Sequence, residues 1–254
     1  MSGLIGGDLE YALKAPDGTY IPAGVLPTRG TKGAPERFLT GGVEIDCCAI
    51  ELTFDPAPTE DAFVSNILEH LNAVKSRYAM YGTLHTIPSI KFNKKVLKSI
   101  RHANEMGCEP DFCVWTNSIN PRPKSNNGLR TFGGHVHIEN ATRDTVKACD
   151  LTLGLWSVVH DSDSDRRKMY GRAGAFRPKS YGMEYRVLSN FWCDSERKIR
   201  RVYQLVQKAK EIQKDIDPLV KAVGGAERIQ NIINESQLFE AKSILKSLGI
   251  DYET

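Results

Sequence analysis

The chain has 254 residues, 41% of them hydrophobic and 26% charged, which suits one large domain or a domain with an appendage. Its net charge of +3 comes from 34 basic and 31 acidic side chains, a balance too even to favour a nucleic-acid-binding protein. Residues 1–13 lack the basic segment of a secretory signal, and no apolar run approaches the ~20 residues that span a bilayer. We therefore expect a cytoplasmic protein without membrane or nucleic-acid partners.

The six cysteines show no Cys-x-x-Cys spacing, which disfavours a disulfide framework or a cysteine zinc site. They are Cys47, Cys48, Cys108, Cys113, Cys149 and Cys193. Reduced, mostly buried thiols are the expectation for a cytoplasmic protein.

The first part of the chain alternates predicted strands with helices. Residues 4–13 read as a strand, and residues 22–42, rich in Gly, Pro and basic side chains, as an ordered loop. A second strand region covers 43–53. Apolar residues at helical spacing predict helices over 59–78, with Thr59 as the N-terminal cap, and over 93–106.

The middle of the chain continues the same mixture. Residues 110–116 are a short apolar strand, and 117–130 form a polar loop. A strand over 131–139 leads into a helix over 142–160, and 161–167 read as a charged loop. The strands do not alternate strictly with helices, which favours an α+β fold with an antiparallel or mixed sheet.

After a strand over 182–192, the chain is helical from residue 195 onward, with a break at Gly224-Gly225. We therefore predict a catalytic domain over 1–194 and a helical extension over 195–254 that packs on it. The basic residues at 197–201 fit a solvated helix face, with a polyanion site as the alternative. These terminal helices are also candidates for a homo-oligomer interface.

Three predicted strands each carry two polar side chains, two residues apart. The pairs are Asp8 and Glu10, His135 and His137, and Glu184 and Arg186. Side chains alternate across a strand, so each pair shares one face and its apolar neighbours occupy the other. We expect all three pairs to meet in one basin on the open face of the sheet.

Such a basin suits a divalent cation with a polyphosphate, because clustered carboxylates repel unless a cation neutralises them. Glu51 adds a further carboxylate, whereas Asp46 faces the other way unless the chain turns at Cys47-Cys48. Arg172 and Arg177 stand in a glycine-bearing segment over 170–178, where guanidinium groups can approach an anion.

Each signal has a simpler reading when taken alone. An Asp-x-Glu pair is most often an exposed strand face, and isolated arginines are most often surface or ion-pair residues. The His-x-His pair fits magnesium, zinc or no metal equally well. Their coincidence in one chain, in strand contexts, favours the cation and phosphate basin.

These residues resemble the glutamine synthetase and glutamate–cysteine ligase superfamily. Residues 130–138 are similar to its Gly-x-His-x-His strand, 182–186 to its Glu-x-Arg strand, and 7–10 to its opening acidic strand. Within it, the sequence looks most like the phage-type carboxylate–amine ligases called COOH–NH2 ligase type 2. That family's signatures are similar to residues 107–112, the His-x-His strand, and 174–178 through 190–192.

The resemblance implies a curved, mainly antiparallel sheet with helices on one face, holding ATP and Mg²⁺ or Mn²⁺. It implies metal ligation by Glu10, Glu51, His135, Glu184 and Asp8, the last standing where the family has a glutamate. It places His137 beside ATP, Arg186 near the transferred phosphoryl group, and Arg172 and Arg177 on phosphates. Lys32 falls in a family-like loop and is assigned to the nucleotide.

The implied activity is ATP-dependent joining of a carboxylate to an amine through an acyl phosphate, in a cytoplasm that is the host's if the gene is a bacteriophage's. We expect Glu184→Ala and Arg186→Ala to abolish turnover while leaving the fold intact. Three alternatives stay open: a zinc hydrolase using His135 and His137, a phosphotransferase on the same scaffold, and a non-enzymatic binding protein.

Overall fold

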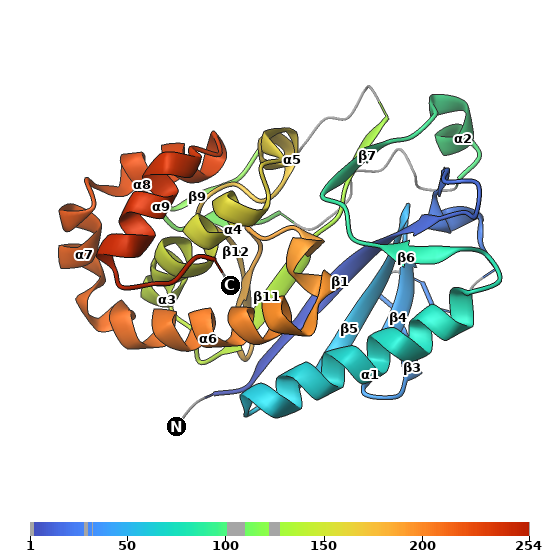
Figure 1. The fold of residues 1–254 in the computed structure, drawn as a ribbon, viewed down its shortest axis with the longest axis horizontal. Coiled ribbons are helices and arrows are strands. Elements are labelled where there is room, and N and C mark those ends of the chain that lie inside the picture. The colour runs from blue at the N-terminus through green and yellow to red at the C-terminus, as the bar shows by residue number, and fades with distance from the viewer. Residues whose placement is uncertain (1–2, 28–29, 32, 101–109, 122–127, 254) are drawn as a thin grey trace.

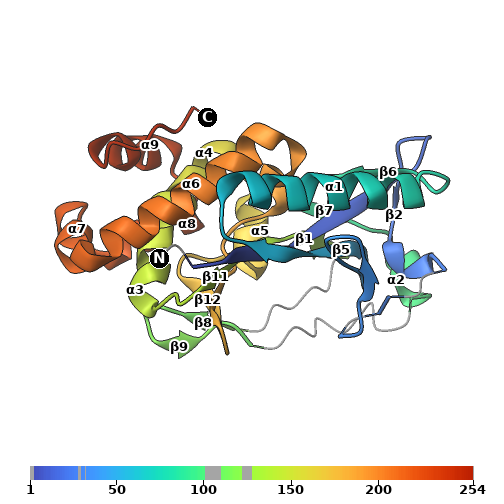
Figure 2. The ribbon, with the colours of Figure 1, turned by 90° about the horizontal axis from the view of Figure 1, so that it is seen from below.

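A computed structural model describes residues 3–27, 30–31, 33–100, 110–121 and 128–253. It confirms the predicted α+β class: a large, mainly antiparallel sheet carries helices on one face (Figures 1 and 2). The strands are β1 Ile5–Lys14, β2 Tyr20–Ile21, β3 Glu36–Phe38, β4 Gly41–Asp46, β5 Ala49–Ala57, β6 Thr83–His85, β7 Ser89–Lys91, β8 Phe112–Cys113, β9 Ser118–Ile119, β10 Leu129–Thr131, β11 Gly134–Glu139, β12 Ala175–Lys179 and β13 Gly182–Tyr185.

The main sheet has the order β3-β4-β5-β1-β11-β13-β12-β8-β9, with β2 and β6 paired to β1. All the pairings within it are antiparallel, and β10 pairs with β7 in a separate small sheet. Strand β1 therefore lies at the centre, between the strand that carries Glu51 and the strand that carries both histidines (Figure 1).

The helices are α1 Glu60–Tyr78, α2 Lys94–Lys98, α3 Arg143–Cys149, α4 Leu155–His160, α5 Ser164–Met169, α6 Glu196–Ile212, α7 Ile216–Ala222, α8 Ala226–Asn234 and α9 Leu238–Ser247. Short 3-10 turns cover Ala23–Val25, Asn190–Asp194 and Gln213–Asp215, and a π-helical stretch, Asp150–Gly154, joins α3 to α4. No helix among the described residues is long and apolar enough to cross a membrane.

Helices α1 and α6 lie side by side over one face of the sheet (Figure 2). Thr59 caps α1 by accepting a hydrogen bond from the backbone of Ala62, as the sequence predicts. The ring of Phe63 lies nearly parallel to Trp192 at 6.4 Å between ring centroids and contacts Tyr203 of α6 at 5.6 Å. The apolar residues of β1, β11 and β13 are buried beneath these helices, which leaves the polar side chains on the opposite face.

The C-terminal helices share this same hydrophobic core, since residues of α6, α8 and α9 are buried in one cluster with those of β1. The division at residue 195 remains a prediction. Two basic residues of the run 197–201 form ion pairs, Arg200 with Glu60 and Asp61 of α1 and Lys198 with Asp194, and the other two, Arg197 and Arg201, donate to backbone carbonyls near the C-terminus. These contacts fit the interpretation of residues 197–201 as a solvated helix face.

Several elements differ from the sequence prediction because the chain turns where the pattern did not show it. The region 43–53 is a hairpin, β4 and β5, whose turn at Cys47 has a φ of 57°. Residues 161–167, predicted as a charged loop, enter helix α5, and the arginine segment at 170–178 runs into strand β12. Only the start of the helix predicted over 93–106 is described, as α2.

Candidate functional site

Two groups of metal-ligand side chains lie on the open face of the central strands. The first consists of Asp8, His137 and Glu184, whose ligand atoms all lie within 4.8 Å of one another. His137 sits opposite Glu184 in the β11–β13 ladder, and its Nε2 lies 3.0 Å from Asp8 Oδ2. This diagonal contact is within reach because His137 is two residues from the position opposite Asp8. Three separate strands therefore supply the group.

The second group consists of Glu10, Asp46 and Glu51, again with ligand atoms within 4.8 Å of one another. Glu10 lies directly opposite Glu51 in the β1–β5 ladder. Asp46 joins them because the chain reverses at Cys47-Cys48, which puts Asp46 and Glu51 on the same face of the hairpin. The turn that the sequence left open is therefore present, and Asp46 belongs to the site.

Positively charged side chains surround the carboxylate of Glu184. Its Oε1 contacts Nη1 of Arg186, and its Oε2 lies 3.3 Å from Nη1 of Arg177 and 3.1 Å from Nζ of Lys179. Arg186 also approaches Asp111, with 3.5 Å between Nε and Oδ2. The first group thus combines carboxylates with three cationic side chains, which is the composition of a site for anionic oxygens and a cation together.

His135 occupies a different position from His137 although both lie on β11. Its Nδ1 is 3.6 Å from Glu184 Oε1 and 3.4 Å from Arg186 Nη1. The ring lies so close to Gly133 that a Cβ there would collide with it, which explains the glycine at this position. The structure therefore brings His137, not His135, into the first group, and places His135 against its arginine.

Burial and neighbouring charges set the protonation of the first group. Burial alone would raise the pKa of Glu184, but the charge of Arg186, together with that of Arg177, lowers it well below its usual range. Burial, followed by the charge of Arg186, lowers the pKa of His135 well below its usual value. At neutral pH, Glu184 is ionised and His135 is neutral.

The second group has the opposite electrostatic character. Burial raises the pKa of Glu10 to about 7, and the hydrogen bond from the Gly133 N–H to Glu10 Oε2 (2.5 Å) opposes this rise. Burial and the negative charges of Glu10 and Asp8 raise the pKa of Glu51 well above its usual range. Such mutual repulsion among carboxylates is the condition that a bound divalent cation relieves.

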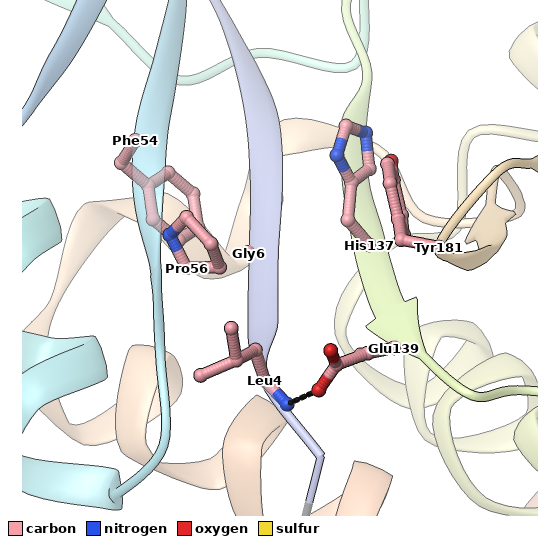
Figure 3. A pocket seen from close by; sticks show the side chains of 7 residues that line it. All are labelled: Leu4, Gly6, Phe54, Pro56, His137, Glu139 and Tyr181. Carbon is pink, nitrogen blue, oxygen red and sulfur yellow. Dashed lines mark hydrogen bonds between the residues drawn. The ribbon is translucent and has the colours of Figure 1, made fainter.

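A pocket of about 240 Å³ opens at the end of β1 beside His137 (Figure 3). It is lined by Leu4, Gly6, Phe54, Pro56, His137, Glu139 and Tyr181. Tyr181 lies beside His137, with 5.8 Å between ring centroids, and Glu139 Oε2 accepts a hydrogen bond from the Leu4 N–H at 2.8 Å. The pocket is mainly apolar with one fixed carboxylate, so it suits a flat organic group that carries a hydrogen-bond donor.

Two predicted phosphate-binding residues are not seen in this site. Arg172 is exposed, and its Nη2 donates to the Lys168 carbonyl of α5 at 3.1 Å, which engages it away from the first group. Lys32 lies outside the described residues. Sequence reasoning missed Lys179 and Tyr181, which lie at the end of the β12–β13 hairpin, and gave no role to Asp111. Period-two spacing from Arg177 would have found Lys179 once β12 was recognised as a strand.

The fold and these two groups define an α+β protein with an acidic site on an open antiparallel sheet, where ligand atoms lie close enough together to hold a metal ion. A profile of the phage phiEco32-like COOH.NH2 ligase-type 2 family matches residues 120–222, in agreement with the resemblance found in the sequence. The family name indicates a carboxylate–amine ligase. A comparison with curated proteins found no match.

The matched range contains both histidines of β11 and the charged residues of β12 and β13, but it begins after β1, β4 and β5. Asp8 and Glu10 are joined to the matched segment by the pairing of β1 with β11, by the Asp8–His137 contact and by the Gly133 N–H bonded to Glu10, and Glu51 is joined through the pairing of β5 with β1. The structure therefore completes the site with residues that the family comparison does not cover.

Proposed function

We propose that the protein is an ATP- and divalent-cation-dependent ligase that joins a carboxylate to an amine through an acyl phosphate. One observation carries this proposal: the two clusters of carboxylate-containing ligand side chains and a set of cationic side chains converge on the open face of the central strands. Phosphoryl transfer requires this combination, because the enzyme must position two negatively charged reactants and offset their charge.

The donor atoms of both groups fit Mg²⁺ or Mn²⁺. Asp8 Oδ1 and His137 Nε2 are buried and have no hydrogen-bond partner among the described residues, although Nε2 lies 3.0 Å from Asp8 Oδ2. Carboxylate oxygens suit both cations, and manganese also tolerates imidazole. Asp8, His137 and Glu184 would hold one cation, and Glu10, Asp46 and Glu51 a second. Bound there, the cations would supply neutralising charge to phosphate and carboxylate oxygens.

The nucleotide can be placed by chemistry. Among the described residues, the lining of the pocket has no lysine or arginine and one carboxylate, Glu139, so the pocket favours the base over the phosphates. An exocyclic amino group of the base would donate to Glu139, and Tyr181 offers an aromatic surface for the ring. The phosphates would then extend past His137 toward Arg177 and Lys179. In this proposal the base occupies one end of the open face and the phosphates occupy its middle.

The reaction needs activation because a carboxylate oxygen is a poor leaving group. The substrate carboxylate attacks the γ-phosphorus, the bond to the bridging oxygen of ADP breaks, and an acyl phosphate forms. The amine then attacks the acyl carbon, phosphate leaves, and the nitrogen loses a proton. Arg186 and Arg177 offset charge on the phosphoryl oxygens, and removing one such preorganised cation typically costs about 10²- to 10³-fold in rate.

The test is phosphate release from ATP and Mg²⁺ in the presence of pooled amino acids and peptides, with mass spectrometry for a product that has lost one water. Asp8→Asn, which removes one oxygen ligand with little change in shape, should abolish release. Asp144→Asn, on an exposed ion pair of α3, is the matched control and should behave as wild type. Turnover without nucleotide would support a zinc hydrolase, and a phosphorylated product without free phosphate would support a phosphotransferase. Absence of magnesium–nucleotide binding would support a binding protein.

A further inference from the structure

Helix α5 carries two adjacent arginines, Arg166 and Arg167, and each has only 1% of its surface exposed. Fully buried arginines are uncommon because a guanidinium loses its hydration on burial and must be compensated by hydrogen bonds. Burial lowers the pKa of Arg166 to about 10, so it remains charged at neutral pH. A buried charge kept in the fold calls for a structural or functional reason.

Arg166 directs its guanidinium at the backbone that follows Arg186. Its Nη1 donates to the Val187 carbonyl at 2.8 Å and its Nη2 to the Leu188 carbonyl at 2.6 Å. Gly171 has a φ of 77°, and a Cβ there would collide with the guanidinium and lie 2.7 Å from the Val187 oxygen. Gly171 therefore leaves the space in which the two-pronged contact forms.

The 187–188 segment that Arg166 holds is connected to both groups of cation ligands. The Leu188 carbonyl also accepts a hydrogen bond from the Gly134 N–H at 3.1 Å, and Gly133 bridges to Ser189. The Gly133 N–H in turn holds Glu10 Oε2. On its other side the segment continues into Arg186, whose side chain contacts Glu184. Only two hydrogen bonds thus separate Arg166 from the Gly133–Gly134 backbone that holds Glu10.

Arg167 provides an internal comparison because it is buried to the same extent. Its Nη2 donates to Ser157 Oγ at 3.2 Å and to the Asp161 carbonyl at 3.0 Å, and its Nε lies 3.4 Å from Ser236 Oγ. All of these partners belong to the helical layer or its loops. The two arginines therefore differ in what they hold rather than in how deeply they lie.

We propose that Arg166 is a positioning residue for the two groups of cation ligands. Its guanidinium fixes the 187–188 backbone, and through this backbone it fixes the orientation of Glu10 and Arg186. This inference rests on the proposed function, because it assumes that these groups bind a divalent cation. A single ammonium cannot reproduce the two-pronged contact, so Arg166→Lys keeps the charge and loses the geometry.

The experiment compares Mn²⁺ binding, measured by electron paramagnetic resonance, with thermal unfolding in the wild type, Arg166→Lys and Arg167→Lys. Both variants should lose thermal stability, since each disturbs a buried arginine. Arg166→Lys should weaken Mn²⁺ binding about 10- to 100-fold, the usual effect of removing a residue that orients ligands, and Arg167→Lys should leave it unchanged. Gly171→Ala, which displaces the guanidinium without replacing it, should act as Arg166→Lys does.

Wild-type Mn²⁺ affinity in Arg166→Lys or in Gly171→Ala would overturn the positioning role, as would equal losses in Arg166→Lys and Arg167→Lys. A wild-type protein that binds no Mn²⁺ would instead overturn the proposed function, and this inference with it. The two failures are therefore separated by the wild-type measurement alone.

Discussion

Glu184→Gln is the most informative single change, because it removes the charge that three cationic side chains surround. Glu184 is fully buried, and the side chain of Arg186 is only 6% exposed. Removing one partner of a buried pair typically costs about 3–5 kcal/mol, because it leaves the other charge uncompensated. The more exposed Arg177 and Lys179 are screened by solvent and contribute less. We therefore expect a loss of about 3–5 kcal/mol in the free energy of unfolding at pH 7.

This result would change the expectation from the sequence, which assumed that altering Glu184 leaves the fold unaffected. The assay is urea unfolding followed by circular dichroism, with a chelator present so that cation binding does not contribute. Glu139→Gln is the control, since an amide oxygen can still accept from the Leu4 N–H. For a chain of this size the loss corresponds to a fall in melting temperature of about 6–20 °C.

The pH dependence gives a second, independent reading of the same variant. The folded-state pKa of Glu184 is depressed below its ordinary value of 4.5. Its contribution to stability is therefore complete above about pH 4.5 and is lost as the pH falls below that value. The difference in the free energy of unfolding between wild type and Glu184→Gln should therefore shrink as the pH falls. A difference under about 1 kcal/mol at pH 7, or one that grows on acidification, would refute this account of the charge cluster.

Three further predictions concern other parts of the molecule. Arg177→Ala should lower ATP-dependent phosphate release by about 10²-fold, whereas Arg172→Ala, whose side chain bonds to α5, should retain wild-type release. Asp46→Asn should weaken Mn²⁺ binding at the second group at least about tenfold in a resonance titration, and an unchanged titration would remove Asp46 from the site. Burial raises the pKa of Asp150 from 3.8 to about 7. The free energy of unfolding of the wild type should therefore fall by up to about 4 kcal/mol relative to that of Asp150→Asn as the pH rises from 4 to 7. Parallel pH profiles of the two proteins in urea unfolding would contradict this.

The sequence predicted the polar strands well because period-two alternation is a local property. Asp8 and Glu10 do share a face of β1, and the apolar residues between and beside them are buried beneath the helices. Thr59 and the apolar stripe of α1 were equally readable, since capping and helical spacing are also local. These features fixed the fold class and the face on which the site lies.

Pairing register could not be read in the same way, because it depends on contacts between distant strands. The spacing of His135 and His137 places both on one face, but only the ladder shows that His137 stands opposite Glu184. Asp46 depended on a turn at Cys47 with positive φ, which neither cysteine signals in the sequence.

Buried charge was the other source of error. Residues 161–167 were predicted as a charged loop, and charged residues are usually exposed, yet Arg166 is fully buried against backbone carbonyls. Arg172 looked like Arg177 because both stand near glycines, but only Arg177 lies on strand β12 and reaches Glu184. The role of such residues is decided by tertiary packing rather than by their sequence context.

Anomalous diffraction from crystals grown with Mn²⁺ and a non-hydrolysable ATP analogue would show whether the two carboxylate clusters bind cations beside a nucleotide. We expect one Mn²⁺ peak within ligand distance of Asp8, His137 and Glu184, and a second beside Glu10, Asp46 and Glu51, with the base in the pocket next to Tyr181. Peaks at other residues, or a nucleotide bound on the helical side of the sheet, would contradict this expectation.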